Sequence, residues 1–324
     1  MGCVSFASVC IAALAIVTIP SPQVLQDPGQ GVPQIVFKSA AGLVTLNVTV
    51  QDARAHYVTG LASADFAVYE DGVKQQVRFF ESTAIPVDLI VLVDRSTSML
   101  DKRAVVREAA RGLIAMLRDR DRGAVMTFSR QVAVAQPLTS DRAALSAALD
   151  TGATDGFTAL HGALYIALRE FHRAPGDADA VRRQAIAVLS DGEDNASLVS
   201  FDDVLETARQ AGVNVYTIRL RTGDSPIAAT LSGEAEQASR ADYEMKALAR
   251  ETGALSFFPN TTQLRAVYAA IGDEIASQYS IAYEPTTPLS NGGFRHVAVQ
   301  VVGNAELHAR TRSGYAARTA TRGE

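Results

Sequence analysis

The chain has 324 residues, of which 48% are hydrophobic and 20% charged, and its formal net charge at pH 7 is −5. At roughly 150 residues per domain, this length predicts about two domains. The composition is that of a globular protein, and the acidic balance argues against a nucleic-acid-binding surface. The two cysteines are Cys3 and Cys10. The rest of the chain therefore has no disulfide, thiolate–zinc site or cysteine nucleophile.

The N-terminal segment resembles a targeting element. Residues 1–21 carry no charged side chain and are rich in Val, Ala, Ile and Leu. This pattern predicts a signal peptide, with a small-x-small cleavage site at Ala13-Leu14-Ala15, or an uncleaved membrane anchor. A misplaced start codon is a third interpretation, because the segment lacks the usual basic residue. Residues 22–32 predict a spacer and residues 319–324 a tail. We therefore expect a secreted, periplasmic or cell-envelope protein.

Two β-rich segments flank the middle of the chain. Residues 43–51 alternate apolar and polar side chains, as a half-buried strand does. Residues 66–70 and 73–80 predict two strands joined by a tight Asp71-Gly72 turn. Strands are predicted again at 279–283, 295–302 and near 307–311. Each segment has too few strands to be stable alone, so we expect the N-terminal segment (33–84) and the C-terminal segment (277–318) to pair in one small β domain.

The segment between them, residues 85–276, alternates strands with helices. Residues 87–93 form an apolar run typical of a central parallel strand. In chain order, further elements are predicted as helix 106–117, strands 123–128 and 132–135, helices 141–149 and 160–171, strand 184–189, helix 201–211, strand 213–220, helix 243–251, strand 254–258 and helix 262–277. This alternation predicts an α/β fold with a doubly wound, mostly parallel sheet. The polar segment 221–242 is expected either to contact a partner or to be an ordinary surface insertion with its own short helix.

Oxygen-bearing side chains follow the predicted strands. Asp94, Ser96 and Ser98 come directly after the apolar run, Thr158 precedes a helix, and Asp191 follows the strand that ends at 189. Ligands of open parallel sheets bind beyond the carboxyl ends of the strands. Neutral hydroxyls and carboxylates suit Mg²⁺, Mn²⁺ or Ca²⁺. The pattern therefore predicts a divalent-cation site.

Each of these residues also has a structural interpretation. Asp94 can be an ordinary strand-end residue, and Ser96, Ser98 or Thr158 can be a helix N-cap without any role in metal binding. Asp191-Gly192 is a common turn dipeptide. His161 is expected to be structural or exposed, because the histidines show no i, i+4 pairing of the kind that holds zinc.

Asp94-x-Ser96-x-Ser98, Thr158 and Asp191-Gly192 together resemble the metal-ion-dependent adhesion site of the von Willebrand factor A (vWA) domain family. The resemblance implies a Rossmann-like fold in which Ser96, Ser98 and Thr158 bind the cation, most often Mg²⁺, directly. It implies that Asp94 and Asp191 act mainly through coordinated waters and hydrogen bonds. The flanking motifs, such as the run from Gly60 to Gly72, are similar to exported bacterial VWFA-related proteins of the acidobacterial type.

The resemblance implies a binding protein and not an enzyme. The metal of such a protein would bind a Glu or Asp side chain of a protein partner. No nucleic-acid partner is expected, and the protein would contact a membrane only through an uncleaved N-terminal segment. The alternatives are a metal-dependent hydrolase of the cell envelope and a structural envelope component whose metal site is vestigial. No catalytic residue and no organic cofactor are predicted.

Overall fold

The computed structural model describes Gly2 and residues 43–82, 85–152, 154–173, 182–191, 194–221, 234–287 and 293–317. By its internal contacts the chain divides into residues 1–35 and 36–324, and all the elements below belong to the second unit. Apart from Gly2, the predicted signal peptide, spacer and tail lie outside the described residues. In the part that is described, no helix has the length and apolarity needed to cross a membrane.

A six-stranded sheet forms the centre of the α/β region. Its strand order is β10-β9-β8-β5-β6-β7, and only β7 runs antiparallel to its neighbour. Every residue of β5 is buried, as the apolar run predicts for a strand covered on both faces. The predicted mostly parallel sheet is thus confirmed. Its strands are β5 (Val87–Asp94), β6 (Arg122–Phe128), β7 (Val132–Thr139), β8 (Arg183–Ser190), β9 (Asn214–Arg219) and β10 (Ser256–Phe257).

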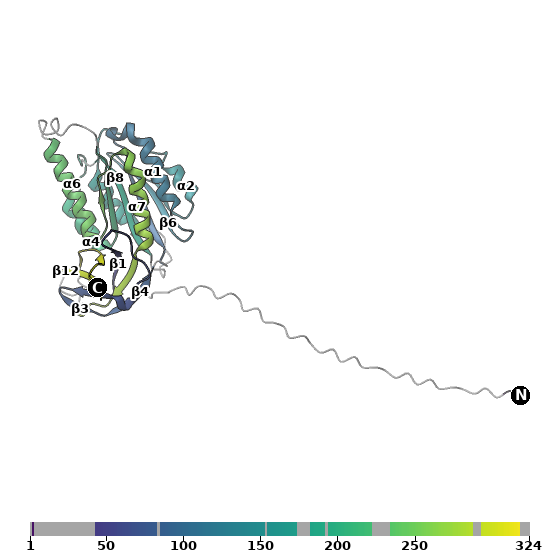
Figure 1. Ribbon diagram of the computed structural model, residues 1–324. Helices are drawn as coiled ribbons and strands as arrows, with labels where there is room; N and C mark the ends of the chain where they lie inside the picture. Colours follow the sequence, from purple (N-terminus) through teal and green to yellow (C-terminus); the bar gives the residue numbers. More distant parts are fainter. Residues whose placement is uncertain are drawn as a thin grey trace, which may run out of the picture. The chain divides into compact units, whose positions relative to one another are not determined.

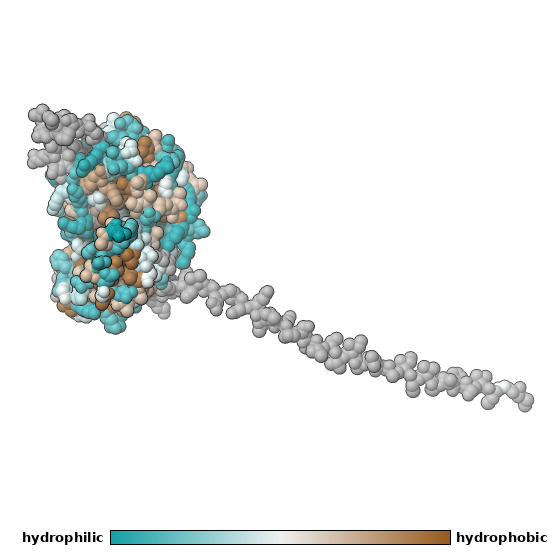
Figure 2. Space-filling view, in the orientation of Figure 1, coloured by the Kyte–Doolittle hydropathy of each residue, from teal (hydrophilic) through white to brown (hydrophobic). Residues whose placement is uncertain are grey.

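Helices cover both faces of this sheet. One apolar core joins the sheet to α1 (Arg103–Ala115), α2 (Arg142–Ala148) and α7 (Leu264–Ser277). A second core joins its other face to α3 (Leu160–Arg173), α4 (Phe201–Ala211) and α6 (Glu234–Glu251). Figure 1 shows α1 and α7 in front of the strands, and the surface on this side mixes hydrophilic and hydrophobic residues (Figure 2). The doubly wound arrangement is therefore present.

The long helix α6 begins earlier than predicted. It starts at Glu234, so the predicted helix start near residue 243 is wrong by nine residues, and the helix expected as an alternative within 221–242 is the first part of α6. Glu, Ala, Gln and Arg dominate this stretch, and these residues favour a helix even where apolar periodicity is weak. Residues 222–233, the remainder of the proposed contact loop, lie outside the described residues.

Two four-stranded antiparallel sheets combine strands from both flanking segments. Their orders are β13-β1-β11-β4 and β14-β12-β2-β3. Both contribute side chains to one apolar core. The N-terminal strands are β1 (Val44–Gln51), β2 (Phe66–Glu70), β3 (Val73–Gln75) and β4 (Val77–Ser82); the C-terminal strands are β11 (Tyr279–Tyr283), β12 (Phe294–Val301), β13 (His308–Arg310) and β14 (Gly314–Ala316). Whether this β region folds as a domain with the proposed limits stays a prediction.

The predicted turn and the strand after it have different outcomes. Asp71 and Gly72 have φ values of 47° and 80°, which is the left-handed geometry of a tight hairpin turn. The prediction of one continuous strand over 73–80 is wrong, because β3 pairs with β2 whereas β4 pairs with β11 in the other sheet. The chain thus changes sheets after Gln75, and alternation alone does not reveal such a change.

Two buried glutamates connect distant parts of the chain. Glu70 accepts hydrogen bonds from the hydroxyls of Tyr283 and Tyr315, both at 2.7 Å. The N-terminal and C-terminal flanking segments therefore meet at one carboxylate. Glu274 of α7 is completely buried and forms an ion pair of 2.7 Å with Arg310 of β13. This second pair joins the β region to the α/β region, next to the amino ends of the parallel strands.

Candidate metal centre

Asp94 is the last residue of β5 and is 1% exposed. One carboxylate oxygen accepts a hydrogen bond from the backbone N–H of Ser96 at 2.7 Å, and the other accepts from the hydroxyl of Ser190 at 2.5 Å. Among the described residues, no arginine or lysine forms an ion pair with it. Burial raises the pKa of Asp94 to about 6, although the hydrogen bonds from Ser190 and Ser96 oppose this shift.

Ser96 and Ser98 lie in the turn that follows β5. Ser96 is buried and Ser98 is exposed, and their hydroxyl oxygens are 3.0 Å apart. Ser96 precedes the 3₁₀ helix η2 (Thr97–Lys102), but its side chain makes no capping hydrogen bond. The residue at the N-cap position of α1 is Lys102, again without a side-chain cap. Helix capping therefore does not account for the two hydroxyls.

Thr158 is buried in the loop before α3. Its backbone N–H donates to the side-chain oxygen of Asn195 at 2.8 Å, and its carbonyl accepts from the Asn195 N–H at 3.0 Å. No hydrogen bond to the Thr158 hydroxyl occurs within the part of the chain that the structure describes. The N-cap interpretation of this hydroxyl thus has no support.

Asp191 follows β8, on the strand next to β5. Its carboxylate lies 3.7 Å from the ammonium nitrogen of Lys102, and its backbone carbonyl accepts from Arg219 at 3.0 Å. Gly192, the second half of the predicted turn dipeptide, lies outside the described residues.

Backbone contacts bring the three loops to the same edge of the sheet. Ser96 forms a β-bridge with Asp155, whose carbonyl accepts from the Thr97 N–H at 3.0 Å. This bridge joins the loop of the two serines to the loop that leads to Thr158. The mutual bonds of Thr158 and Asn195 then join the second loop to the one after Asp191. The predicted residues thus come from three segments that meet, as the parallel strand order requires.

The donor set fits a hard divalent cation. Neighbouring oxygen ligands of an octahedral Mg²⁺ with bonds of about 2.1 Å lie about 3.0 Å apart, and this is the separation of the Ser96 and Ser98 hydroxyl oxygens. In the described ranges, no three His, Cys, Asp or Glu side chains are grouped so that they can hold a metal. The oxygen groups that the three loops offer at this edge are the hydroxyls of Ser96, Ser98 and Thr158 and the carboxylates of Asp94 and Asp191.

Three residues near the site were not assigned a role from the sequence. Ser190 holds Asp94, Asn195 positions the Thr158 backbone, and Lys102 contacts Asp191. No spacing signal points to Lys102, which follows Asp94 by eight residues and ends the 3₁₀ helix η2. His161 is buried, and its ring nitrogens lie 3.3 Å from Asp194 and 3.2 Å from Glu244. The expected structural role of His161 agrees with this placement.

The family is shown by comparison with known sequences. The pattern of the von Willebrand factor type A domain matches residues 88–267, which is more than half of the chain. The chain belongs to this family. No curated protein sequence matches it.

Solved structures of similar shape share little sequence with the chain. A von Willebrand factor type A protein from Catenulispora acidiphila is 13% identical, with 87% of this chain and 76% of that chain covered and a TM-score of 0.49. Proximal thread matrix protein 1 from the mussel byssus, with a zinc-occupied MIDAS motif, is 17% identical, with 64% and 50% covered and a TM-score of 0.48. The chain thus spans about half the length of the mussel protein. The vWF domain of the type V pili tip protein Mfa5 from Porphyromonas gingivalis is 14% identical, with 59% and 95% covered and a TM-score of 0.45.

Proposed function

We propose that this vWA protein binds a protein partner through a divalent-metal adhesion site at the carboxyl edge of its central sheet. The metal is Mg²⁺ or a similar cation, and the partner presents a Glu or Asp side chain to it. The observation that carries the proposal is that the hydroxyl oxygens of Ser96 and Ser98 lie 3.0 Å apart beside the buried Asp94 carboxylate. The Ser96 side chain does not cap the helix that follows it.

In this proposal, some residues of the three loops bind the cation directly and others bind it through water molecules. The hydroxyls of Ser96, Ser98 and Thr158 would hold the cation, while Asp94 and Asp191 would orient its waters. Hydroxyl ligands are neutral, so a bound dication supplies a strongly attractive position for one carboxylate of the partner. The hydrogen bond from the Ser190 hydroxyl fixes the orientation of the Asp94 carboxylate at the end of β5.

We propose a binding role and not a catalytic one. Hydrolysis needs a general base or nucleophile within hydrogen-bond reach of a substrate. His161 is the imidazole nearest to the site in sequence, and Asp194 and Glu244 occupy both of its ring nitrogens. A panel of phosphatase, esterase and protease substrates tests this point. Metal-dependent turnover that disappears in Asp94→Ala would favour the hydrolase instead.

We also propose that the protein is exported to the periplasm, the cell envelope or the medium. The support is the uncharged apolar pattern of residues 1–21. Cell fractionation with the native N-terminus tests it, together with mass determination of the exported chain. Retention of the full-length protein in the cytoplasm would contradict export without affecting the metal site.

The central experiment measures metal and partner binding together. Mg²⁺ at 100 times its dissociation constant should stabilise the full chain by about 2.7 kcal/mol, and Ser96→Ala/Ser98→Ala should abolish this gain. Ser146→Ala, on helix α2 and outside the three loops of the site, is the control. An envelope extract passed over the immobilised protein should yield a partner with Mg²⁺ and none with chelator. A partner retained equally in both conditions would favour the structural component with a vestigial site.

A further inference from the structure

Lys102 directs its charge into the candidate metal site. It is the last residue of η2, and its ammonium donates to the backbone carbonyl of Ser98 at 2.9 Å. The same nitrogen lies 3.7 Å from a carboxylate oxygen of Asp191. Only 11% of the Lys102 side chain and 16% of the Asp191 side chain are exposed. The ammonium therefore lies between two of the residues that are expected to serve the metal.

This placement differs from that of an ordinary surface lysine. Lysine side chains usually extend their strongly hydrated charge into water. Lys102 instead donates a hydrogen bond to the carbonyl of Ser98 and forms a longer ion pair with Asp191. Because water is largely excluded there, charges at this position interact more strongly than they do at the surface.

The charge balance of the site depends on this residue. Asp94 and Asp191 together carry two negative charges when ionised, which is sufficient to neutralise a dication. Lys102 cancels one of them. A dication bound beside it then keeps one uncompensated positive charge, and a single carboxylate from outside the chain is needed for neutrality.

We propose that the Lys102 ammonium competes with the metal cation for the negative charge of the site. It weakens the intrinsic affinity of the site for divalent cations and keeps the bound cation short of one negative charge, so that metal and carboxylate bind cooperatively. This inference rests on the proposed metal-binding function. It adds that a residue outside the ligand set regulates the site.

The test is calorimetric titration of the full chain with Mn²⁺ alone. Lys102→Met should bind Mn²⁺ at least tenfold more tightly than the unmodified protein. Lys246→Met is the matched control, because this substitution also removes one positive charge. Lys246 contacts the ring of Phe258, near the same edge of the sheet. The affinity of this variant should stay within about twofold of the original. Unchanged or weaker binding by Lys102→Met overturns the inference.

A second variant separates charge from packing. Lys102→Arg keeps the positive charge and should keep the affinity of the unmodified protein, which also covers the case in which Lys102→Met does not fold. Tighter binding by Lys102→Arg would overturn the charge argument. Failure of all variants and of the unmodified chain to bind Mn²⁺ would instead overturn the proposed metal site itself.

Acetate tests the cooperative part of the inference. At constant ionic strength, replacing chloride by acetate should increase the Mn²⁺ affinity of the unmodified protein by a larger factor than that of Lys102→Met. Equal factors would show that Lys102 does not preserve a charge for a carboxylate ligand.

Discussion

The two ends of strand β5 carry the same side chain in opposite electrostatic surroundings. Asp88 and Asp94 are both almost completely buried. Asp88 accepts from Arg122 at 2.6 and 2.8 Å and from Arg182 at 2.7 Å. Asp94 accepts from the backbone N–H of Ser96 and from the hydroxyl of Ser190, and among the described residues it forms no ion pair with an arginine or lysine. The charge of Asp88 is thus compensated by arginines of the protein, whereas the charge of Asp94 has no such partner among the described residues.

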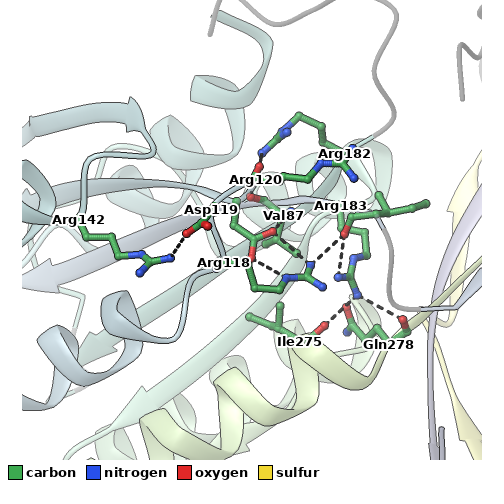
Figure 3. Close-up of polar contacts among 11 residues, drawn as sticks. Val87, Arg118, Asp119, Arg120, Arg142, Arg182, Arg183, Ile275 and Gln278 are labelled. Atoms are coloured by element: carbon green, nitrogen blue, oxygen red, sulfur yellow. Dashed lines mark hydrogen bonds and ion pairs between the residues drawn. The ribbon is translucent and has the colours of Figure 1, made fainter. Parts of the chain in front are cut away.

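The arginines at the amino end of β5 serve the fold in additional ways. Arg182 also donates to the carbonyls of Val87 and Arg120, and the neighbouring Arg183 donates to those of Ile275 and Gln278 (Figure 3). Burial lowers the pKa of Arg183 to about 10, so it stays charged at neutral pH. These contacts fasten β5 and β8 to the junction between α7 and β11.

The comparison indicates different purposes for the two edges. An ion pair that is buried and fully hydrogen-bonded specifies structure, whereas a buried carboxylate without a cation destabilises the fold. Such a carboxylate at a strand end is understandable where a cation from outside the protein completes it. The contacts at the amino edge therefore support the architecture, and the unpaired carboxylate at the carboxyl edge agrees with the proposed metal-binding role.

The largest expected effect is at Asp88. Asp88→Asn leaves two arginines without their carboxylate and should lower the free energy of unfolding by about 3 kcal/mol, measured by urea denaturation. Asp150→Asn is the control, because Asp150 also pairs with two arginines, Arg107 and Arg111, but is exposed. Its cost should be below about 1 kcal/mol. Similar costs for both variants would remove the distinction between the two edges.

The opposite sign is expected at the other end of β5. The pKa of Asp94 is raised to about 6 from its ordinary 3.8, so its ionised form destabilises the metal-free fold by about 2 to 3 kcal/mol at pH 7. Asp94→Asn should relieve this cost while abolishing stabilisation by Mg²⁺. Thermal unfolding with and without the metal measures both effects. A clear loss of metal-free stability would show that the carboxylate supports the fold.

The pH dependence follows from the same raised pKa. Because folded Asp94 binds its proton more tightly than the unfolded chain does, its favourable contribution is complete below pH 3.8 and is lost as pH rises to about 6. Metal binding has the reverse dependence, since the cation must displace that proton. Mg²⁺ affinity should therefore fall about tenfold per pH unit below pH 6. Affinity that is constant between pH 5 and 7 would argue against a role for the Asp94 carboxylate.

The smallest expected effect on stability is at Ser98. Its side chain is exposed, so Ser98→Ala should change the metal-free free energy of unfolding by less than about 0.5 kcal/mol. Loss of one direct ligand should nevertheless weaken Mg²⁺ binding by about tenfold, measured by calorimetry. If binding is unchanged, the hydroxyl pair is not the metal site.

Local patterns were sufficient to predict much of the fold. The apolar run 87–93 specifies a strand covered on both faces, and the Asp71-Gly72 dipeptide specifies a tight turn. The spacing of Asp94, Ser96 and Ser98 placed the candidate site at a strand end. Patterns of this kind depend on neighbours in the sequence, so the sequence expresses them directly.

The partners of each charge could not be predicted in the same way. The sheet order brings Ser190 to Asp94 across 96 residues and Arg182 to Asp88 across 94 residues. The change of sheet between β3 and β4 likewise depends on strands from the far end of the chain.

The sequence by itself determined the alternation of elements and the oxygen-rich loops at the strand ends, because periodicity and spacing are local properties. Only the tertiary structure decided that Asp88 is neutralised, that Asp94 is not, and that Lys102 faces Asp191. The physical reason is that burial and pairing of a charge depend on which distant groups the packed sheet brings within a few ångströms.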